Sequence, residues 1–159
     1  MDDASLAQEQ RTRWPWLIVA IVLLLGMCYY AQRIDTWQSY DDEGGYLYAA
    51  WRITLGEVPY RDFLTPQLPG FLYPGAVLLL VSGYSLRIAR LGVALLTCIS
   101  LGLAVLTAKR LWGWAAALLS LPLLVVQHDV YWAARFFRPE APMLFWGSLG
   151  LLLVVEAQL

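Results

Sequence analysis

Charged side chains are scarce in this sequence of 159 residues. Only 14% of the residues are Asp, Glu, Lys or Arg, whereas 60% are hydrophobic. An average soluble domain carries about 25% charged residues. The net charge of −1 leaves no basic surface for nucleic acid. The apolar residues occur in long runs, which is typical of a protein with several membrane-spanning helices.

Cysteine and histidine are also rare. The two cysteines, Cys28 and Cys98, lie inside apolar runs, and the sequence has neither a disulfide framework nor a zinc-binding spacing. The one histidine, His128, is followed by Asp129. A single His–Asp pair at a helix end is more often structural than part of a metal site. The sequence thus indicates no cofactor, and a divalent metal ion is possible but not indicated.

Four apolar segments have the composition of membrane-spanning helices. They are residues 14–31, 86–108, 112–127 and 141–156. A helix needs about 20 apolar residues to cross the hydrocarbon core, and several of the segments end in Trp or Tyr, which prefer the headgroup level. The sequence predicts an all-α fold, a polytopic transmembrane helical bundle with about four spanning helices. Residues 32–85 are expected to form a juxtamembrane loop with helices of its own.

The positions of the basic residues predict the orientation of these spans. Arg11 and Arg13 precede the first span, so we expect the N-terminus in the cytoplasm and the next loop outside. The 68–81 segment is apolar but only about 14 residues long, a length more often interfacial or re-entrant than spanning. If it does not cross, Lys109-Arg110 reaches the cytoplasm and both acidic loops lie outside. If it does cross, these loops lie on opposite faces.

The first outer loop starts with three consecutive carboxylates, Asp41, Asp42 and Glu43. A carboxylate at the boundary between lipid and water can accept a proton from a hydroxyl group or bind a metal ion. It can equally cap a helix, because free backbone N–H groups at a helix start favour an anion. Residues 41–56 have the spacing of an amphipathic helix lying on the membrane. Its apolar face consists of Leu47, Tyr48, Trp51 and Leu55.

The second outer loop contains Arg135, Arg138 and Glu140, directly before the last span. One interpretation is structural, since Glu140 suits the positive end of a helix dipole. The other is a second acidic group that faces Asp42, with Arg135 or Arg138 binding a phosphate. A guanidinium group suits phosphate because its fork bonds two oxygens at once.

Several short motifs follow one another between Asp42 and Leu153. They are Asp42-Glu43 followed by Gly-x-Tyr, Gly56-x-x-Pro59-Tyr60-Arg61-Asp62-Phe63, Pro69-Gly70 with Tyr73, Ala89-Arg90-Leu91, Arg110-Leu111-Trp112-Gly113 and Arg138-Pro139-Glu140. In this order and spacing the sequence resembles the polyprenyl-phosphate-sugar-dependent integral membrane glycosyltransferases of the GT-C class. It is most similar to the bacterial branch related to protein mannosyltransferases, aminoarabinose transferases and lipopolysaccharide-core galacturonosyltransferases.

This resemblance implies a catalytic site formed by the two outer loops. Asp42, with Glu43 beside it, would act as the base or orient the acceptor, and Glu140 would be the second acidic residue. The donor would be a sugar on a polyprenyl phosphate, and the acceptor hydroxyl would belong to a lipid, a glycan or a protein. The reaction would invert the anomeric centre and take place at the outer face of a bacterial plasma membrane.

The resemblance also indicates where donor phosphate would bind. Relatives often carry a lysine at the position of Gln67, and a neutral Gln can hydrogen-bond phosphate without neutralising it. We therefore expect Arg61, together with Arg135 and Arg138, to supply the positive charge.

Length leaves one alternative open. Members of the class run to several hundred residues, so we expect this chain to be the N-terminal portion of a larger glycosyltransferase. The alternative is a small non-catalytic membrane protein that assists assembly or binds a lipid carrier. A transporter is a weaker option, because the middle of each predicted span lacks charged residues.

Overall fold

The computed structural model describes the backbone of residues 3–35 and 41–158, and the side chains of residues 13–35 and 42–158. The side chains of Arg11 and Asp41 therefore lie outside the described part. Within these described residues, six helices follow one another. They are α1 (Asp3–Ala31), α2 (Asp41–Thr54), α3 (Pro69–Val81), α4 (Leu86–Val126), α5 (His128–Ala133) and α6 (Glu140–Gln158).

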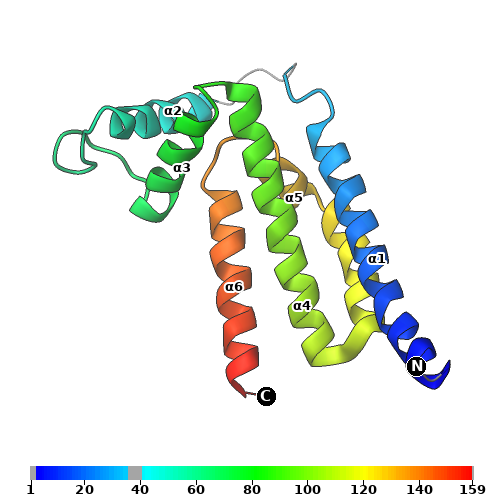
Figure 1. The fold of residues 1–159 in the computed structure, drawn as a ribbon. Helices are drawn as coiled ribbons and strands as arrows, with labels where there is room; N and C mark the ends of the chain where they lie inside the picture. The colour runs from blue at the N-terminus through cyan, green and yellow to red at the C-terminus, as the bar shows by residue number, and fades with distance from the viewer. Residues whose placement is uncertain (1–2, 36–40, 159) are drawn as a thin grey trace.

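Three of these helices are long and apolar enough to cross a membrane. Their spanning segments are Arg13–Ala31, Leu86–Val126 and Glu140–Gln158. The 41-residue helix α4 is folded back on itself at Gly113, whose φ of 80° and ψ of −176° are not helical. Its two arms, 86–112 and 114–126, lie antiparallel and form a bundle with α1 and α6 (Figure 1). The predicted all-α membrane bundle is confirmed.

The bundle is packed through small and branched side chains on the inner faces of its helices. Ala94 and Ala117, one from each arm of α4, have no exposed surface and allow the helices to approach closely. The Tyr30 hydroxyl donates to the Val125 carbonyl at 2.9 Å and joins the end of α1 to the second arm. Leu24 and Leu119 are more than 60% exposed, as lipid-facing side chains of a membrane bundle would be.

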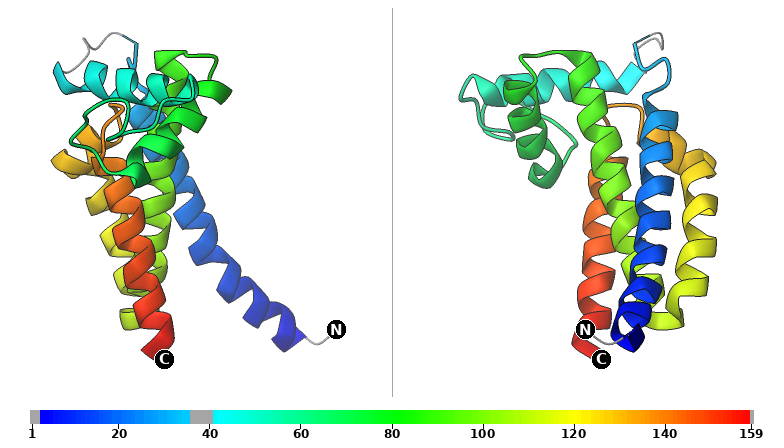
Figure 2. Two further views of the ribbon diagram at one scale, coloured as in Figure 1. Left: turned by 90° about the vertical axis from the view of Figure 1, so that its left-hand side faces the viewer. Right: turned by 45° about the vertical axis from the view of Figure 1, so that its right-hand side comes forward.

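Helices α2 and α3 lie together at one end of the bundle. Helix α2 runs across this end, and α3 packs against it instead of following the long axis of the bundle (Figures 1 and 2). We call this the loop end, because it also carries α5 and the 134–139 loop. The other end, which carries the reversal at Gly113, is the turn end. The position of α3 agrees with an interfacial helix in the 68–81 segment.

One boundary differs from the predicted spans. The first arm of α4 continues to residue 112, so Lys109 and Arg110 lie within a helix and not in a connecting loop. Lys109 lies over the rings of Trp16 and Trp114, and Arg110 pairs with Glu156 at 2.7 Å. These contacts satisfy both cations locally, so the helix does not need to end before them. The short helix α5 was not predicted either.

Candidate functional site

Glu43 is buried in an ion pair at the loop end. Its side chain has no exposed surface, and its two carboxylate oxygens accept hydrogen bonds from Arg90 Nε at 3.0 Å and Nη2 at 2.6 Å. The backbone N–H of Phe137 donates to the same carboxylate at 2.8 Å. This pair joins α2, α4 and the 134–139 loop. The catalytic role expected of Glu43 stays a prediction; in the structure its enclosed carboxylate holds these three segments together.

Arg135 is also turned into the protein. Its side chain is 2% exposed, and its guanidinium donates to the carbonyl oxygens of Tyr30 at 2.9 Å and Gln32 at 2.5 Å. These carbonyls belong to the C-terminal end of α1, where a cation is favoured by the helix dipole. In the structure Arg135 is bonded to the end of α1, and its expected phosphate contact stays a prediction.

Asp42, unlike its neighbour, is exposed at the start of α2. The next turn of the helix carries Tyr46, whose surroundings connect the two acidic loops. Burial raises the pKa of Tyr46, the negative charges of Asp42 and Glu140 raise it further, and the positive charge of Arg138 lowers it. The phenol thus lies within electrostatic range of a carboxylate from each loop. Asp42 and Glu140 are brought to the same end of the molecule.

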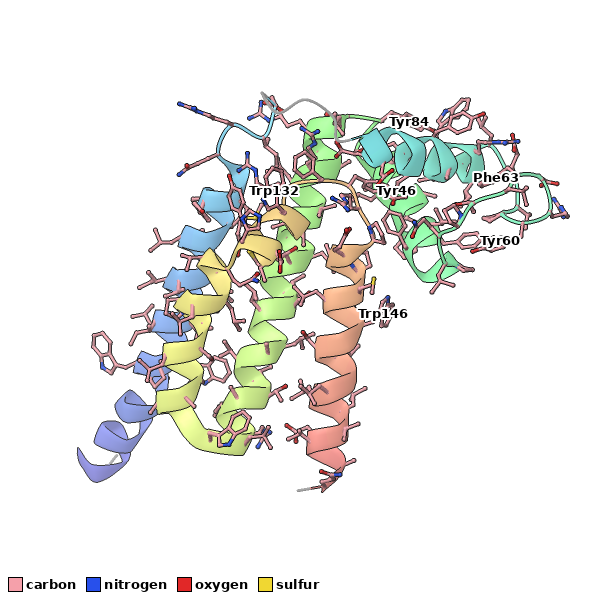
Figure 3. All side chains as sticks on the ribbon, turned by 180° about the vertical axis from the view of Figure 1, so that it is seen from behind. Tyr46, Tyr60, Phe63, Tyr84, Trp132 and Trp146 are labelled. Carbon is pink, nitrogen blue, oxygen red and sulfur yellow. The ribbon has the colours of Figure 1, made fainter. Side chains whose placement is uncertain are left out.

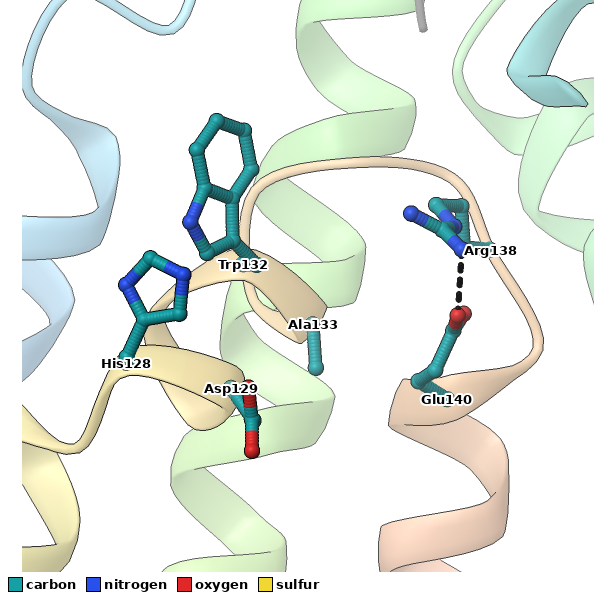
Figure 4. Close-up of a pocket in the computed structure, with 6 residues that line it drawn as sticks. All are labelled: His128, Asp129, Trp132, Ala133, Arg138 and Glu140. Atoms are coloured by element: carbon teal, nitrogen blue, oxygen red, sulfur yellow. Dashed lines mark ion pairs between the residues drawn. The ribbon is translucent and has the colours of Figure 1, made fainter. Parts of the chain in front are cut away.

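Arg138 and Glu140 form one wall of a cavity at the loop end. Arg138 Nη2 lies 2.6 Å from Glu140 Oε1, and both side chains are partly exposed. The cavity has a volume of about 490 Å³. Its lining consists of His128, Asp129, Trp132, Ala133, Arg138 and Glu140. Figure 4 shows His128 and Trp132 on one side, the ion pair on the other, and Asp129 and Ala133 between them.

Arg61 and Gln67 lie elsewhere. Arg61 donates to both oxygens of Asp62, at 3.0 and 2.8 Å, and these bonds, with the backbone N–H of Val58, lower the pKa of Asp62 to about 2. The Gln67 carbonyl oxygen accepts a bond from the Tyr60 hydroxyl. Neither Arg61 nor Gln67 lines the cavity. Figure 3 shows Tyr60 at the outer end of the unit formed by α2 and α3, away from Trp132.

The sequence did not reveal the burial of Arg90, which stands in one of the motifs, or the place of Trp132 in this region. Arg90 lies at the start of a span, where an arginine is expected to extend toward the headgroups, yet its side chain is 2% exposed. Trp132 is one of eight tryptophans, and most of them are explained by membrane interfaces. Among the described side chains no group of three or more His, Cys, Asp or Glu residues is placed to bind a metal ion.

The fold and this site define the class of protein. An all-helical membrane bundle carries, at one end, two carboxylates and an arginine from two different loops. Residues 26–159 match the family model of the dolichyl-phosphate-mannose-protein mannosyltransferases, and the chain belongs to this family. It is therefore an integral membrane protein of a glycosyltransferase family. No curated protein and no solved structure gives a significant match to it.

Proposed function

We propose that this protein transfers a sugar from a polyprenyl phosphate to an acceptor hydroxyl at the loop end of the bundle. The single observation that carries this proposal is the 2.8 Å hydrogen bond from the Phe137 N–H to Glu43, because it fixes the start of α2, with Asp42, against the loop that leads to Glu140. Two carboxylates from separate loops at one membrane surface can serve the two partners of a transfer reaction. The family supports the general reaction, and the lipid-linked donor is the proposed substrate.

Asp42 is the proposed base. It is exposed at the loop end, at the start of α2. In the proposed step the acceptor oxygen attacks the anomeric carbon while the bond from that carbon to the phosphate oxygen breaks. The phosphate leaves with the bonding electrons, and Asp42 takes the proton of the acceptor hydroxyl. Attack from the side opposite the phosphate inverts the anomeric centre.

Arg138 is the proposed partner of the leaving phosphate. Its guanidinium is 23% exposed and faces the cavity beside Glu140. Charge-assisted bonds from a guanidinium stabilise the negative charge that develops on a leaving phosphate. In this proposal Glu140 orients Arg138, and Arg61 and Gln67 remain secondary candidates for contact with the lipid phosphate. The acceptor is a hydroxyl of a lipid, a glycan or a protein.

The proposed setting is a bacterial plasma membrane with the loop end outside. Lys109 and Arg110 lie near the turn end, and basic residues favour the cytoplasmic side. The start of α1, which carries Arg13, lies near the same end in Figure 1. This orientation puts the N-terminus in the cytoplasm and exposes the site to lipid-linked sugars on the outer leaflet.

The test is sugar transfer by the protein expressed from its complete gene and reconstituted in lipid nanodiscs. The donor is polyprenyl-phosphate mannose with a radiolabelled sugar, offered with membrane extracts that contain lipid, glycan and protein acceptors. We expect Asp42→Asn to lower the transfer rate by about 100-fold or more, as loss of a general base does. Asp35→Asn is the matched control, because Asp35 is an exposed carboxylate that pairs with Arg87 at 3.4 Å. An Asp42→Asn variant with the wild-type rate would refute the role of Asp42.

A further inference from the structure

One wall of the cavity at the loop end has no part in the chemistry proposed above. This wall consists of His128 and Trp132, which lie across the cavity from Arg138 and Glu140, and Asp129 lies between the two sides (Figure 4). The cavity volume of about 490 Å³ lies within the range that small-molecule sites occupy. The chemistry of this wall indicates what the cavity holds.

Trp132 is held in place by its neighbours. Its ring stacks on Phe136, with the centroids 5.3 Å apart and an angle of 10° between the planes. Phe136 is 1% exposed, and the guanidinium carbon of Arg90 lies over its ring, 5.1 Å from the ring centroid. The indole is thus attached to the same buried ion pair that joins the two loops. A ring fixed in this way loses little conformational entropy when a ligand packs against it.

Two polar residues, His128 and Asp129, line the same cavity as Trp132. His128 lies 5.9 Å from Trp132, ring to ring, and the exposed Asp129 carboxylate accepts a bond from the Gln127 amide at 3.2 Å. A pyranose ring has apolar C–H faces and a rim of hydroxyl groups. An aromatic ring can therefore pack against a C–H face of the sugar, and neighbouring carboxylates and an imidazole can bond to its hydroxyl groups.

We propose that this cavity binds a pyranose ring, with Trp132 against its C–H face and Asp129 bonded to its hydroxyl groups. The inference rests on the proposed function and names the place of the sugar in it. The sugar is that of the donor, because the cavity also contains Arg138, and the phosphate of a lipid-linked sugar is attached directly to the ring. Trp132 and Asp129 are positioning residues that select the sugar.

The experiment measures affinity in nanodiscs, without turnover, for two probes. One is polyprenyl-phosphate mannose, and the other is the same polyprenyl phosphate without sugar. In the wild type the sugar should tighten binding. Trp132→Ala should weaken binding of the sugar-bearing lipid by about three- to tenfold, the magnitude of one aromatic contact. It should leave the affinity for the bare lipid unchanged. Trp132→Phe should keep most of the affinity for the sugar-bearing lipid. Trp146→Ala, at a 55% exposed tryptophan of α6, is the matched control and should change neither value.

A second variant avoids the packing of the indole. Asp129→Asn keeps the shape of an exposed side chain, and it should weaken binding of the sugar-bearing lipid alone. The pyranose site is refuted if the wild type binds the two lipids with equal affinity. It is also refuted if Trp132→Ala and Asp129→Asn still bind the sugar-bearing lipid as tightly as the wild type does. Neither result contradicts the proposed function. Loss of bare-lipid binding in both variants also overturns the pyranose site. A soluble mannoside acceptor serves as a third probe. If the variants weaken binding of this mannoside alone, the pocket belongs to the acceptor sugar and the donor assignment is wrong. Failure of the wild type to bind either lipid refutes the proposed function itself.

Discussion

Glu43 and Arg90, 47 positions apart in the sequence, form a two-point ion pair with almost no exposed surface. The pair holds the start of α2 against the first arm of α4. The N–H of Phe137 bonds to the same carboxylate, so the second outer loop is fixed to the first through one side chain. The mutual position of Asp42 and Glu140 therefore depends on a residue that does not face the cavity.

Loss of this ion pair should destabilise the fold. Glu43→Gln keeps the size of the side chain but leaves the buried Arg90 without its counter-charge. Breaking a buried ion pair by removing one partner costs about 3–5 kcal/mol, and we expect a loss of free energy of unfolding in this range. Denaturant-induced unfolding in detergent micelles, followed by tryptophan fluorescence, measures it.

Asp42→Asn is the control for this experiment, because Asp42 precedes Glu43 on the same helix but is exposed. We expect it to change the free energy of unfolding by less than about 0.5 kcal/mol, the usual range for surface substitutions. Equal stability of Glu43→Gln and Asp42→Asn would contradict the structural role of Glu43. Substitution of Asp42 should thus lower activity, and substitution of its neighbour Glu43 should lower stability.

The different roles of Asp42 and Glu43 show where sequence reasoning stops. The start of α2 was predicted from its acidic residues and apolar spacing, and the helix Asp41–Thr54 agrees with residues 41–56. Consecutive residues on a helix point in directions about 100° apart, so one of the two carboxylates had to turn toward the bundle. Only the position of Arg90, far along the sequence, decides which one.

The same limit applies to the second loop. The sequence predicted that Arg135, Arg138 and Glu140 gather before the last helix, and α6 does begin at Glu140. The irregular backbone at 134–139 has no periodicity from which the direction of a side chain follows. Arg135 reaches the end of α1 because the carbonyls of Tyr30 and Gln32 lie there, a contact over more than 100 residues.

Arg138 should matter for binding of the donor. Arg138→Gln removes the positive charge at the cavity but keeps a hydrogen-bonding side chain. A hydrogen bond to a charged group contributes about 1.5–3 kcal/mol, so KM for polyprenyl-phosphate mannose should rise by about tenfold or more. Transfer assays over a range of donor concentrations measure this change. Arg87→Gln removes an exposed arginine paired with Asp35 and should leave KM unchanged. An unchanged KM in Arg138→Gln would exclude Arg138 from the phosphate site.

The reversal of α4 should depend on Gly113. The combination of φ 80° and ψ −176° is essentially restricted to glycine, and another residue there costs about 1–3 kcal/mol. Gly113→Ala should lower the free energy of unfolding by this amount, although its Cβ would meet no atom within 4 Å. Gly147→Ala is the control, since Gly147 lies inside α6 with equally open surroundings and should be neutral or slightly stabilising. A neutral Gly113→Ala would mean that the backbone at the turn adopts another conformation.

The side of the membrane on which each loop lies can be measured by cysteine labelling. Leu64→Cys and Asp129→Cys place thiols at exposed positions of the first and second loops, and Trp112→Cys places one beside the turn at Gly113. Each is made in a Cys28→Ser background, while Cys98 is buried and can stay. An impermeant maleimide should label the two loop positions on intact cells, and Trp112→Cys only after lysis, because the basic residues near that end favour the cytoplasmic side. Labelling of one loop from outside and of the other only after lysis would separate Asp42 from Glu140 and exclude a shared site.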